Sequence, residues 1–226
     1  MPLPMVHFLV AVEMHKLDDR HPSPPFILGS IAPDAIHARP NTDRSHKNHT
    51  HLLTKPHSQT TDAEYWALVR AFLSRHWAKD EHIDFIEGYA AHVMADRLWL
   101  DGLFRPFRAR VTHLSDAELA RLYYREADQV DIFLYRRMAW RPQIWQNLAA
   151  ATAVDTAQLV SAQEVDAWRQ RTLHWYDDPQ NNPQIEPDYI TYAAVVDFAT
   201  QAASTIREHL AEWKGERGNM PAMDDD

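Results

Sequence analysis

A strongly apolar run over residues 88–102, GYAAHVMADRLWLDG, places a histidine and an aspartate four residues apart. At the period of an α-helix, His92 and Asp96 project from the same side, one turn apart. Apolar and aromatic residues fall within about sixty degrees of the pair on a helical wheel, so this side is too apolar to face solvent. The sequence therefore predicts a helix over residues 82–100 that carries an imidazole and a carboxylate into the interior.

A buried imidazole and carboxylate need compensation. A divalent cation suits both groups at once. Two structural alternatives are a His–Asp hydrogen bond inside the core and a salt bridge from Asp96 to the neighbouring Arg97. This helix alone leaves a metal or catalytic role and a structural role open.

The composition favours an all-α fold with a single domain. Only five glycines occur among 226 residues, long stretches are rich in Ala, Leu, Arg, Glu and Trp, and β-branched runs are few. A hydrophobic fraction of 45% can fill one sizeable core. We expect a single-domain multi-helix bundle over residues 1–213, followed by a disordered acidic tail over residues 214–226.

The formal net charge of −9 and the absence of a Lys/Arg-rich block argue against nucleic acid as a partner. No apolar run approaches the length of about 20 residues that a membrane-spanning helix needs, which argues against stable membrane insertion. The start of the chain has no basic region before its short apolar segment, so we expect a cytoplasmic protein. The oligomeric state cannot be inferred.

Several helix boundaries can be read from local patterns. We expect a first helix over residues 5–17, an extended proline-rich connection after it, a long irregular stretch over residues 33–59 and a last helix over residues 188–213. Three Ser/Thr-x-x-Glu patterns predict helix N-termini through capping boxes, namely Thr61 with Glu64, Ser115 with Glu118, and Ser161 with Glu164.

Other ligand-type residues are ambiguous when each is taken alone. His7, in the apolar run VHFLVA, is either a core histidine or a ligand. Asp34, after Pro33, is either a turn or cap residue or a ligand. The cluster HKNHTH is either a solvated loop or a source of ligands, and at least one of His46, His49 and His51 is a bystander.

Two further sets of polar residues are more readily explained by the surface. His174 and Asp178 have helical spacing but border a proline-rich loop, and we expect them to be exposed. Tyr124, Asp128 and Asp131 can reach a pocket wall, although a solvated helix face explains the two aspartates better.

The order GSIAPDA, His cluster and GYAAHVMADRLW resembles the zinc-dependent phospholipase C family, whose all-helical fold is shared with the P1-type nucleases. The resemblance spans roughly the first hundred residues. It implies a zinc site with His7, Asp34, His51, His92 and Asp96 as ligands, and Asp34 as ligand and possible general base. Since the chain has no cysteine, only His and carboxylate ligands are available, which suit zinc and also iron or manganese.

The chain also departs from that family. Secreted members carry a further histidine soon after the Asp of the His-x-x-x-Asp helix, then a His-x-x-x-Glu pair, a signal peptide and an N-terminal amine ligand. None of these occurs in this sequence. We therefore expect a compact cytoplasmic branch with one or two metal ions.

The resemblance implies a metal-dependent hydrolase in which activated water attacks a small or lipid-derived phosphoester. Two alternatives remain: a non-enzymatic helical metalloprotein with a degenerate site, and a His/carboxylate iron enzyme of another class. An HD-type phosphohydrolase is disfavoured because the chain contains no His-Asp dipeptide. A closed coordination shell would favour a structural metal, and an open position would favour catalysis.

Overall fold

The computed structural model describes residues 3–16, 18–79, 81–156 and 158–218. These described residues form helices, turns and loops with one isolated β-bridge and no strand, which confirms the all-α class. The α-helices are α1 (Pro4–Lys16), α2 (Pro24–Gly29), α3 (Arg44–Thr50), α4 (Asp62–Trp77), α5 (Ile83–Trp99), α6 (Arg105–Arg110), α7 (Asp116–Arg137), α8 (Arg141–Ala150), α9 (Ala162–Trp175) and α10 (Tyr192–Gly218). The short turns between them are the 3-10 turns η1 (Ala32–Ala38), η2 (His57–Gln59) and η4 (Pro179–Asn181) and the π turn η3 (Leu100–Phe104).

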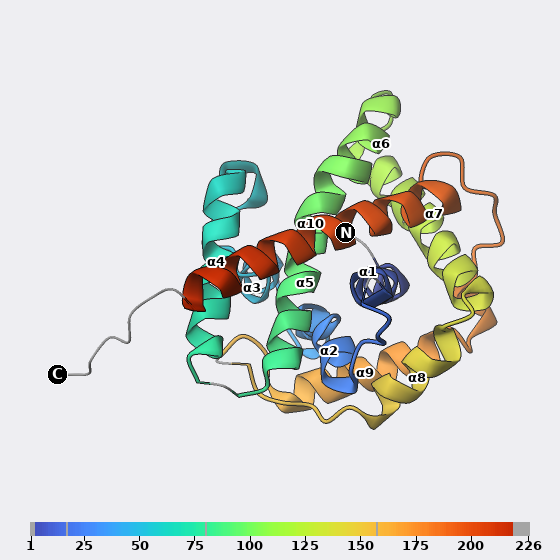
Figure 1. Cartoon of the computed structure of the whole chain (residues 1–226). Helices are drawn as coiled ribbons and strands as arrows, with labels where there is room; N and C mark the ends of the chain where they lie inside the picture. The colour runs from blue at the N-terminus through green and yellow to red at the C-terminus, as the bar shows by residue number, and fades with distance from the viewer. Residues whose placement is uncertain (1–2, 17, 80, 157, 219–226) are drawn as a thin grey trace.

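Two helices form the centre of the molecule. In α1 every residue from Met5 to Val12 is buried, and in α5 burial is continuous from Phe85 to Arg97. A helix that is buried on all sides lies in the interior of a bundle. Figure 1 shows α5 running through the middle, with α3 and α4 on one side, α7 on the other, and α10 crossing over it. Both helices that supply the predicted histidines are thus core elements.

The helix N-termini that the capping boxes predict are confirmed for α4, α7 and α9. In each case the Ser or Thr side chain accepts the backbone N–H of the Glu three residues later, and that Glu accepts the N–H of the cap residue. These reciprocal bonds satisfy N–H groups that the first helical turn leaves unpaired.

Glycines allow α2 and α5 to approach each other closely. A Cβ atom at Gly88 would lie 2.2 Å from the carbonyl oxygen of Phe26, and one at Gly29 would lie 2.1 Å from that of Phe85. Only a residue without Cβ fits at such a backbone contact. The contact holds the end of α2 directly against the helix that carries His92 and Asp96.

The structure corrects the expected course of residues 22–59. The segment expected to be extended forms α2, which starts with Pro24 and Pro25 in its first turn and with Ser23 as cap. Proline fits there because the first helical N–H groups have no intrahelical partner. The stretch expected to be irregular contains η1 and α3, and Asp43 caps α3 by accepting from the N–H groups of Ser45 and His46.

At the other end, α10 continues to Gly218, so residues 214–218 belong to a helix and not to the expected tail. The rest of that tail, residues 219–226, lies outside the described residues. Among the described helices, none combines the length and the apolar character that crossing a membrane requires.

Candidate metal centre

Four elements bring five ligand-type side chains into one cluster. His7 comes from α1, Asp34 from η1, His51 from the C-terminal end of α3, and His92 and Asp96 from α5. Their exposed fractions lie between 1% and 8%. These five residues, called the His/Asp cluster below, are the five candidates that the sequence singled out, and the inward direction of His92 and Asp96 is as expected.

Short distances connect the nitrogen and oxygen atoms of the cluster. Asp96 lies at its base, with its Oδ2 3.2 Å from Nε2 of His51 and 3.8 Å from Nε2 of His92, and its Oδ1 3.6 Å from Nε2 of His7. Asp34 lies on the opposite side of the cluster, 3.5 Å from Nε2 of His51 and 4.0 Å from Nε2 of His92. The ligand atoms form two overlapping groups of three, His7 with His92 and Asp96, and Asp34 with His51 and His92, and within each group these atoms lie within 4.8 Å of one another.

In His51 and His92, the other ring nitrogen is held by a backbone carbonyl group. Nδ1 of His92 lies 2.8 Å from the carbonyl oxygen of Ser30, and Nδ1 of His51 lies 2.9 Å from that of Lys47. A carbonyl oxygen only accepts, so each Nδ1 carries the hydrogen and each neutral ring presents a lone pair at Nε2. This is the outer-shell arrangement that orients histidines that bind metal ions.

His7 and Asp96 have buried polar atoms without hydrogen-bond partners. Both ring nitrogens of His7 and both carboxylate oxygens of Asp96 are inaccessible, and apart from the 3.2 Å approach of Asp96 Oδ2 to Nε2 of His51, none has a hydrogen-bond partner within the described part of the chain. The ring of His7 stacks on that of His92, with 3.8 Å between ring centroids. Unpaired buried polar atoms are costly and rare in folded proteins. A cation bound among them would satisfy these atoms, so the residues present fit a metal ion.

Burial and the two carboxylates shift the pKa values of the histidines in opposite directions. Burial lowers the pKa of His7 well below its usual value and also lowers the pKa of His92. Burial acts on His51 in the same direction, but Asp34 and Asp96 outweigh it and raise the pKa of His51. His7 and His92 are therefore neutral at neutral pH, the form in which a histidine can bind a metal ion.

Both carboxylates of the cluster are ionised. Burial alone would raise the pKa of Asp34, but the Lys47 ammonium, followed by the adjacent histidines, holds it well below its usual range. For Asp96, the neighbouring His92 and the contact with His51 likewise outweigh burial and lower the pKa. Lys47 Nζ donates to Oδ1 of Asp34 at 2.8 Å and lies 3.3 Å from Nε2 of His37.

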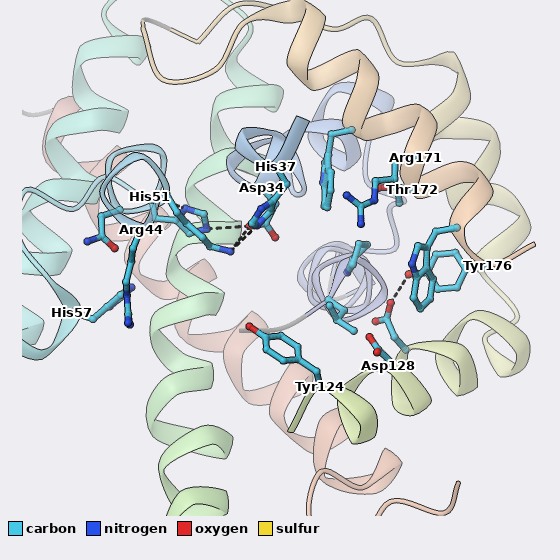
Figure 2. A pocket seen from close by; sticks show the side chains of 17 residues that line it. Asp34, His37, Arg44, His51, His57, Tyr124, Asp128, Arg171, Thr172 and Tyr176 are labelled. Carbon is cyan, nitrogen blue, oxygen red and sulfur yellow. Dashed lines mark hydrogen bonds and ion pairs between the residues drawn. The ribbon is translucent and has the colours of Figure 1, made fainter. Parts of the chain in front are cut away.

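A cavity of about 610 Å³ opens on one side of the cluster. Asp34 and His51 line it, whereas His7, His92 and Asp96 lie behind them. Figure 2 shows Arg44 and His57 on one side of Asp34, Arg171 and Thr172 on the other, and Tyr124 and Asp128 on the facing wall. The His/Asp cluster is thus enclosed by protein at the back and accessible from the cavity at the front.

The two aspartates of α7 do not form the solvated helix face that the sequence suggested. Tyr124, Asp128 and Asp131 all line the cavity, and Asp131 is completely buried. Oδ1 of Asp131 accepts the backbone N–H of Met5 at 3.1 Å, and Oδ2 accepts the hydroxyl of Tyr176. Asp131 therefore ties α7 to the N-terminal turn of α1, the helix that carries His7.

The remaining candidates lie elsewhere. His46 closes the capping box of α3 with Asp43, and His49 is exposed, so both are bystanders beside His51. His174 and Asp178 are exposed, as expected.

The sequence offered Arg97 as an alternative partner of Asp96. Arg97 pairs with Asp62 through its Nε at 2.8 Å, so the alternative salt bridge from Asp96 to Arg97 does not form.

Sequence reasoning missed the cations of the cavity. Lys47, Arg44 and Arg171 line it, but the sequence analysis considered only the histidines of the segment around Lys47. Once α3 is recognised as a helix, the i, i+4 spacing of Lys47 and His51 places both on one side of it and would have suggested the association.

The chain was compared with family models, with curated proteins and with solved structures, and none of the three comparisons finds a match. The assignment of the site consequently rests on its geometry and on the motif resemblance.

Proposed function

We propose that this protein is a metal-dependent phosphoester hydrolase and that zinc is its metal. The observation that carries the proposal is the His/Asp cluster, which combines unpaired buried nitrogen and oxygen atoms with one side open to a cavity. Catalytic zinc sites keep an open position, whereas structural zinc sites are closed by protein ligands. The motif resemblance to the zinc-dependent phospholipase C family supports the same reaction.

The ring of His92 limits the number of ions. Its ligand atom belongs to two groups whose members lie within 4.8 Å of one another, one with His7 and Asp96 and one with Asp34 and His51. Nδ1 of His92 is used by the carbonyl group of Ser30, so the ring has one lone pair, at Nε2, for one ion. We therefore favour one ion, held by His92 and the other members of one group, over two ions of equal occupancy.

A bound divalent ion supplies Lewis-acid activation of water and of a phosphoryl oxygen. The residues of the chain would orient and hold the ion. His51 and His92 are fixed in one tautomer by backbone carbonyl groups, and Asp96 holds the charge at the closed end. We assign Asp34 as a ligand in preference to a general base, because a carboxylate whose pKa is held well below its usual range takes up a proton poorly.

The cavity suits an anionic, partly apolar ligand. Lys47 and Arg44 contribute positive charge beside the open side of the cluster, and Tyr124, Trp168 and Trp175 contribute aromatic surface. Its volume falls in the range of about 300–1,000 Å³ typical of small-molecule sites. A small or lipid-derived phosphoester fits both properties.

The decisive experiment combines metal content with hydrolysis. The protein is purified without added metal, analysed by elemental mass spectrometry, and assayed with zinc, manganese or iron(II) on p-nitrophenyl phosphate and bis-p-nitrophenyl phosphate. We expect close to one zinc per chain, and hydrolysis that is lost in His92→Ala together with the metal. His49→Ala is the matched control because it removes an exposed histidine from the adjoining helix.

Loss of metal from both variants would point to general instability and would contradict the site. Metal bound by the wild type without hydrolysis of either ester would reject the hydrolase and favour the non-enzymatic metalloprotein. If the protein stays free of metal after incubation with each ion, the His/Asp cluster is part of the packed core and does not bind metal.

A further inference from the structure

A continuous row of side chains leads from the His/Asp cluster along one wall of the cavity. Asp34 pairs with Lys47, whose Nζ lies 3.3 Å from Nε2 of His37. The ring of His37 lies 5.6 Å from that of Trp168 on α9, and the guanidinium carbon of Arg171 lies 5.1 Å above the Trp168 ring. All five residues line the cavity.

Arg171 differs from its neighbours because no carboxylate neutralises it. Arg169, on the same helix, pairs with Asp166, and Arg39, beside η1, pairs with Glu164 at 2.5 Å. Within the described residues, Arg171 has neither a hydrogen bond nor an ion pair, and its contact is with the face of Trp168. An acidic protein, with a net charge of −9, thus has an exposed guanidinium in the lining of this cavity that no carboxylate of the described residues neutralises.

Trp168, whose ring lies under this guanidinium, also has an unused donor. Its Nε1 is buried and has no acceptor within the described part of the chain. Buried indole N–H groups normally find a hydrogen-bond partner. A guanidinium held on an aromatic face without a carboxylate partner is an arrangement that binds carboxylate or phosphate oxygens.

We propose that Arg171, with Trp168, forms a second anion subsite in the cavity, so that the substrate carries an anionic group in addition to the phosphoryl group at the metal centre. The second group is a phosphate or a carboxylate, joined to the first by a linker that follows His37. This inference rests on the proposed function for the role of the metal centre. The binding of the second anion depends only on the wall formed by α9 and η1.

Phosphonates test the subsite without hydrolysis. Calorimetric titrations of the zinc-loaded protein compare three series of increasing chain length, namely alkylphosphonates, α,ω-diphosphonates and ω-carboxyalkylphosphonates. We expect one chain length at which a second anionic group tightens binding at least about tenfold, the contribution of one charge-assisted contact. The diphosphonate and the carboxylate series show which anion the subsite prefers. Metal content is measured after each titration, because diphosphonates can remove zinc.

Three substitutions locate the effect. In Arg171→Gln the advantage of the second anion disappears while binding of the plain alkylphosphonate persists. In Arg121→Gln, which removes an exposed arginine of α7 outside the cavity, the advantage remains. Arg44→Gln removes an arginine of the cavity lining on the other side of Asp34, and we expect the advantage to remain there as well.

An equal affinity for mono- and bifunctional phosphonates at every chain length would overturn the proposal. So would an advantage that survives in Arg171→Gln or that disappears in Arg44→Gln alone. The outcome is separable from the proposed function: a bifunctional advantage without any ester hydrolysis supports the subsite and contradicts the hydrolase. Ester hydrolysis without this advantage supports the hydrolase and contradicts the subsite.

Discussion

The Nε2 atoms of His51 and His92 lie 3.3 Å apart, although each ring already directs its Nδ1–H at a backbone carbonyl group. Two neutral rings in this arrangement would point lone pairs at each other, which is unfavourable unless a proton or a cation lies between them. The carboxylates that raise the pKa of His51 favour a proton in the metal-free protein. A metal ion would take the place of that proton.

The first prediction concerns this competition. Below the raised pKa of His51, zinc must displace a proton, so binding is expected to release roughly one proton per ion and to weaken on acidification. Calorimetry at one pH in two buffers of different protonation enthalpy measures the number of protons released. Zinc binding with no proton release at pH 6 would show that His51 is neutral in the metal-free protein.

The second prediction separates the two interpretations of His7. In His7→Phe, the aromatic ring that stacks on His92 is retained and both unpaired ring nitrogens are removed. We expect the metal-free variant to be at least as stable as the wild type, because buried polar atoms without partners are eliminated. The stabilisation by zinc, about 2.7 kcal/mol at one hundred times Kd, should shrink strongly in the variant at the same zinc concentration.

Thermal unfolding with and without zinc checks the His7 prediction. An equal zinc-induced rise in Tm in wild type and His7→Phe would make His7 a core histidine with no role as a ligand. His15→Phe is a suitable control, since that ring also packs on an aromatic side chain, Phe26, but lies outside the His/Asp cluster.

Much of this architecture is predictable from local sequence patterns. The reciprocal bonds at Thr61 and Ser115 depend on residues three apart, and the inward direction of His92 follows from the helical period. The segment around His51 was harder to predict because α3 is seven residues long and largely polar, so the burial of His51 depends on packing against η1 and His92 of α5.

The environment of Asp131 could not be read from the sequence for a related reason. Val130 and Ile132 flank it on α7, but an aspartate is ordinarily a surface residue, and its burial results from the docking of Met5 of α1 and of Tyr176 at the end of α9, which are distant in sequence. The five cluster residues were found by combining motifs. Arg171 was not, because its relevance depends on the absence of a nearby carboxylate in three dimensions.

The third prediction is a pH dependence carried by Asp131. Burial raises the pKa of Asp131 to about 8, whereas an aspartate in an unfolded chain titrates near 3.9. Between these values the folded protein retains a proton that the unfolded chain has lost. The contribution of Asp131 to stability therefore declines as pH rises from about 4 to 8, by about 1.4 kcal/mol per pH unit.

Substitution to asparagine isolates the contribution of Asp131. Asp131→Asn keeps an oxygen for the N–H of Met5 and removes the titration. We expect a flatter dependence of the unfolding free energy on pH between 5 and 8, measured by urea denaturation, and a variant more stable than wild type at pH 8. Asp177→Asn, at an exposed site, should leave the slope unchanged. Parallel slopes for Asp131→Asn and wild type would refute the raised pKa.

The fourth prediction tests the close approach of α2 and α5. In Gly88→Ala the new methyl group meets the backbone carbonyl group of Phe26, which cannot move without shifting α2. We expect a destabilisation of about 1–3 kcal/mol or more. Gly215→Ala is the matched control, because nothing lies within 4 Å of its Cβ position on α10, and helix propensity should stabilise it by up to about 1 kcal/mol. Equal Tm values for the two variants would contradict the tight contact.

The last prediction tests whether Lys47 binds the anionic ester or holds Asp34 in its position. Lys47→Met keeps the length of the side chain but removes the ammonium that donates to Asp34 at 2.8 Å. Because Lys47 competes with the metal for that carboxylate, zinc content should persist, whereas KM for an anionic ester should rise about tenfold or more through loss of a charged contact in the cavity. Lys47→Arg should recover part of this loss. Steady-state kinetics together with metal analysis check both quantities, and loss of zinc from Lys47→Met would instead make Lys47 a residue that holds Asp34 in its ligand position.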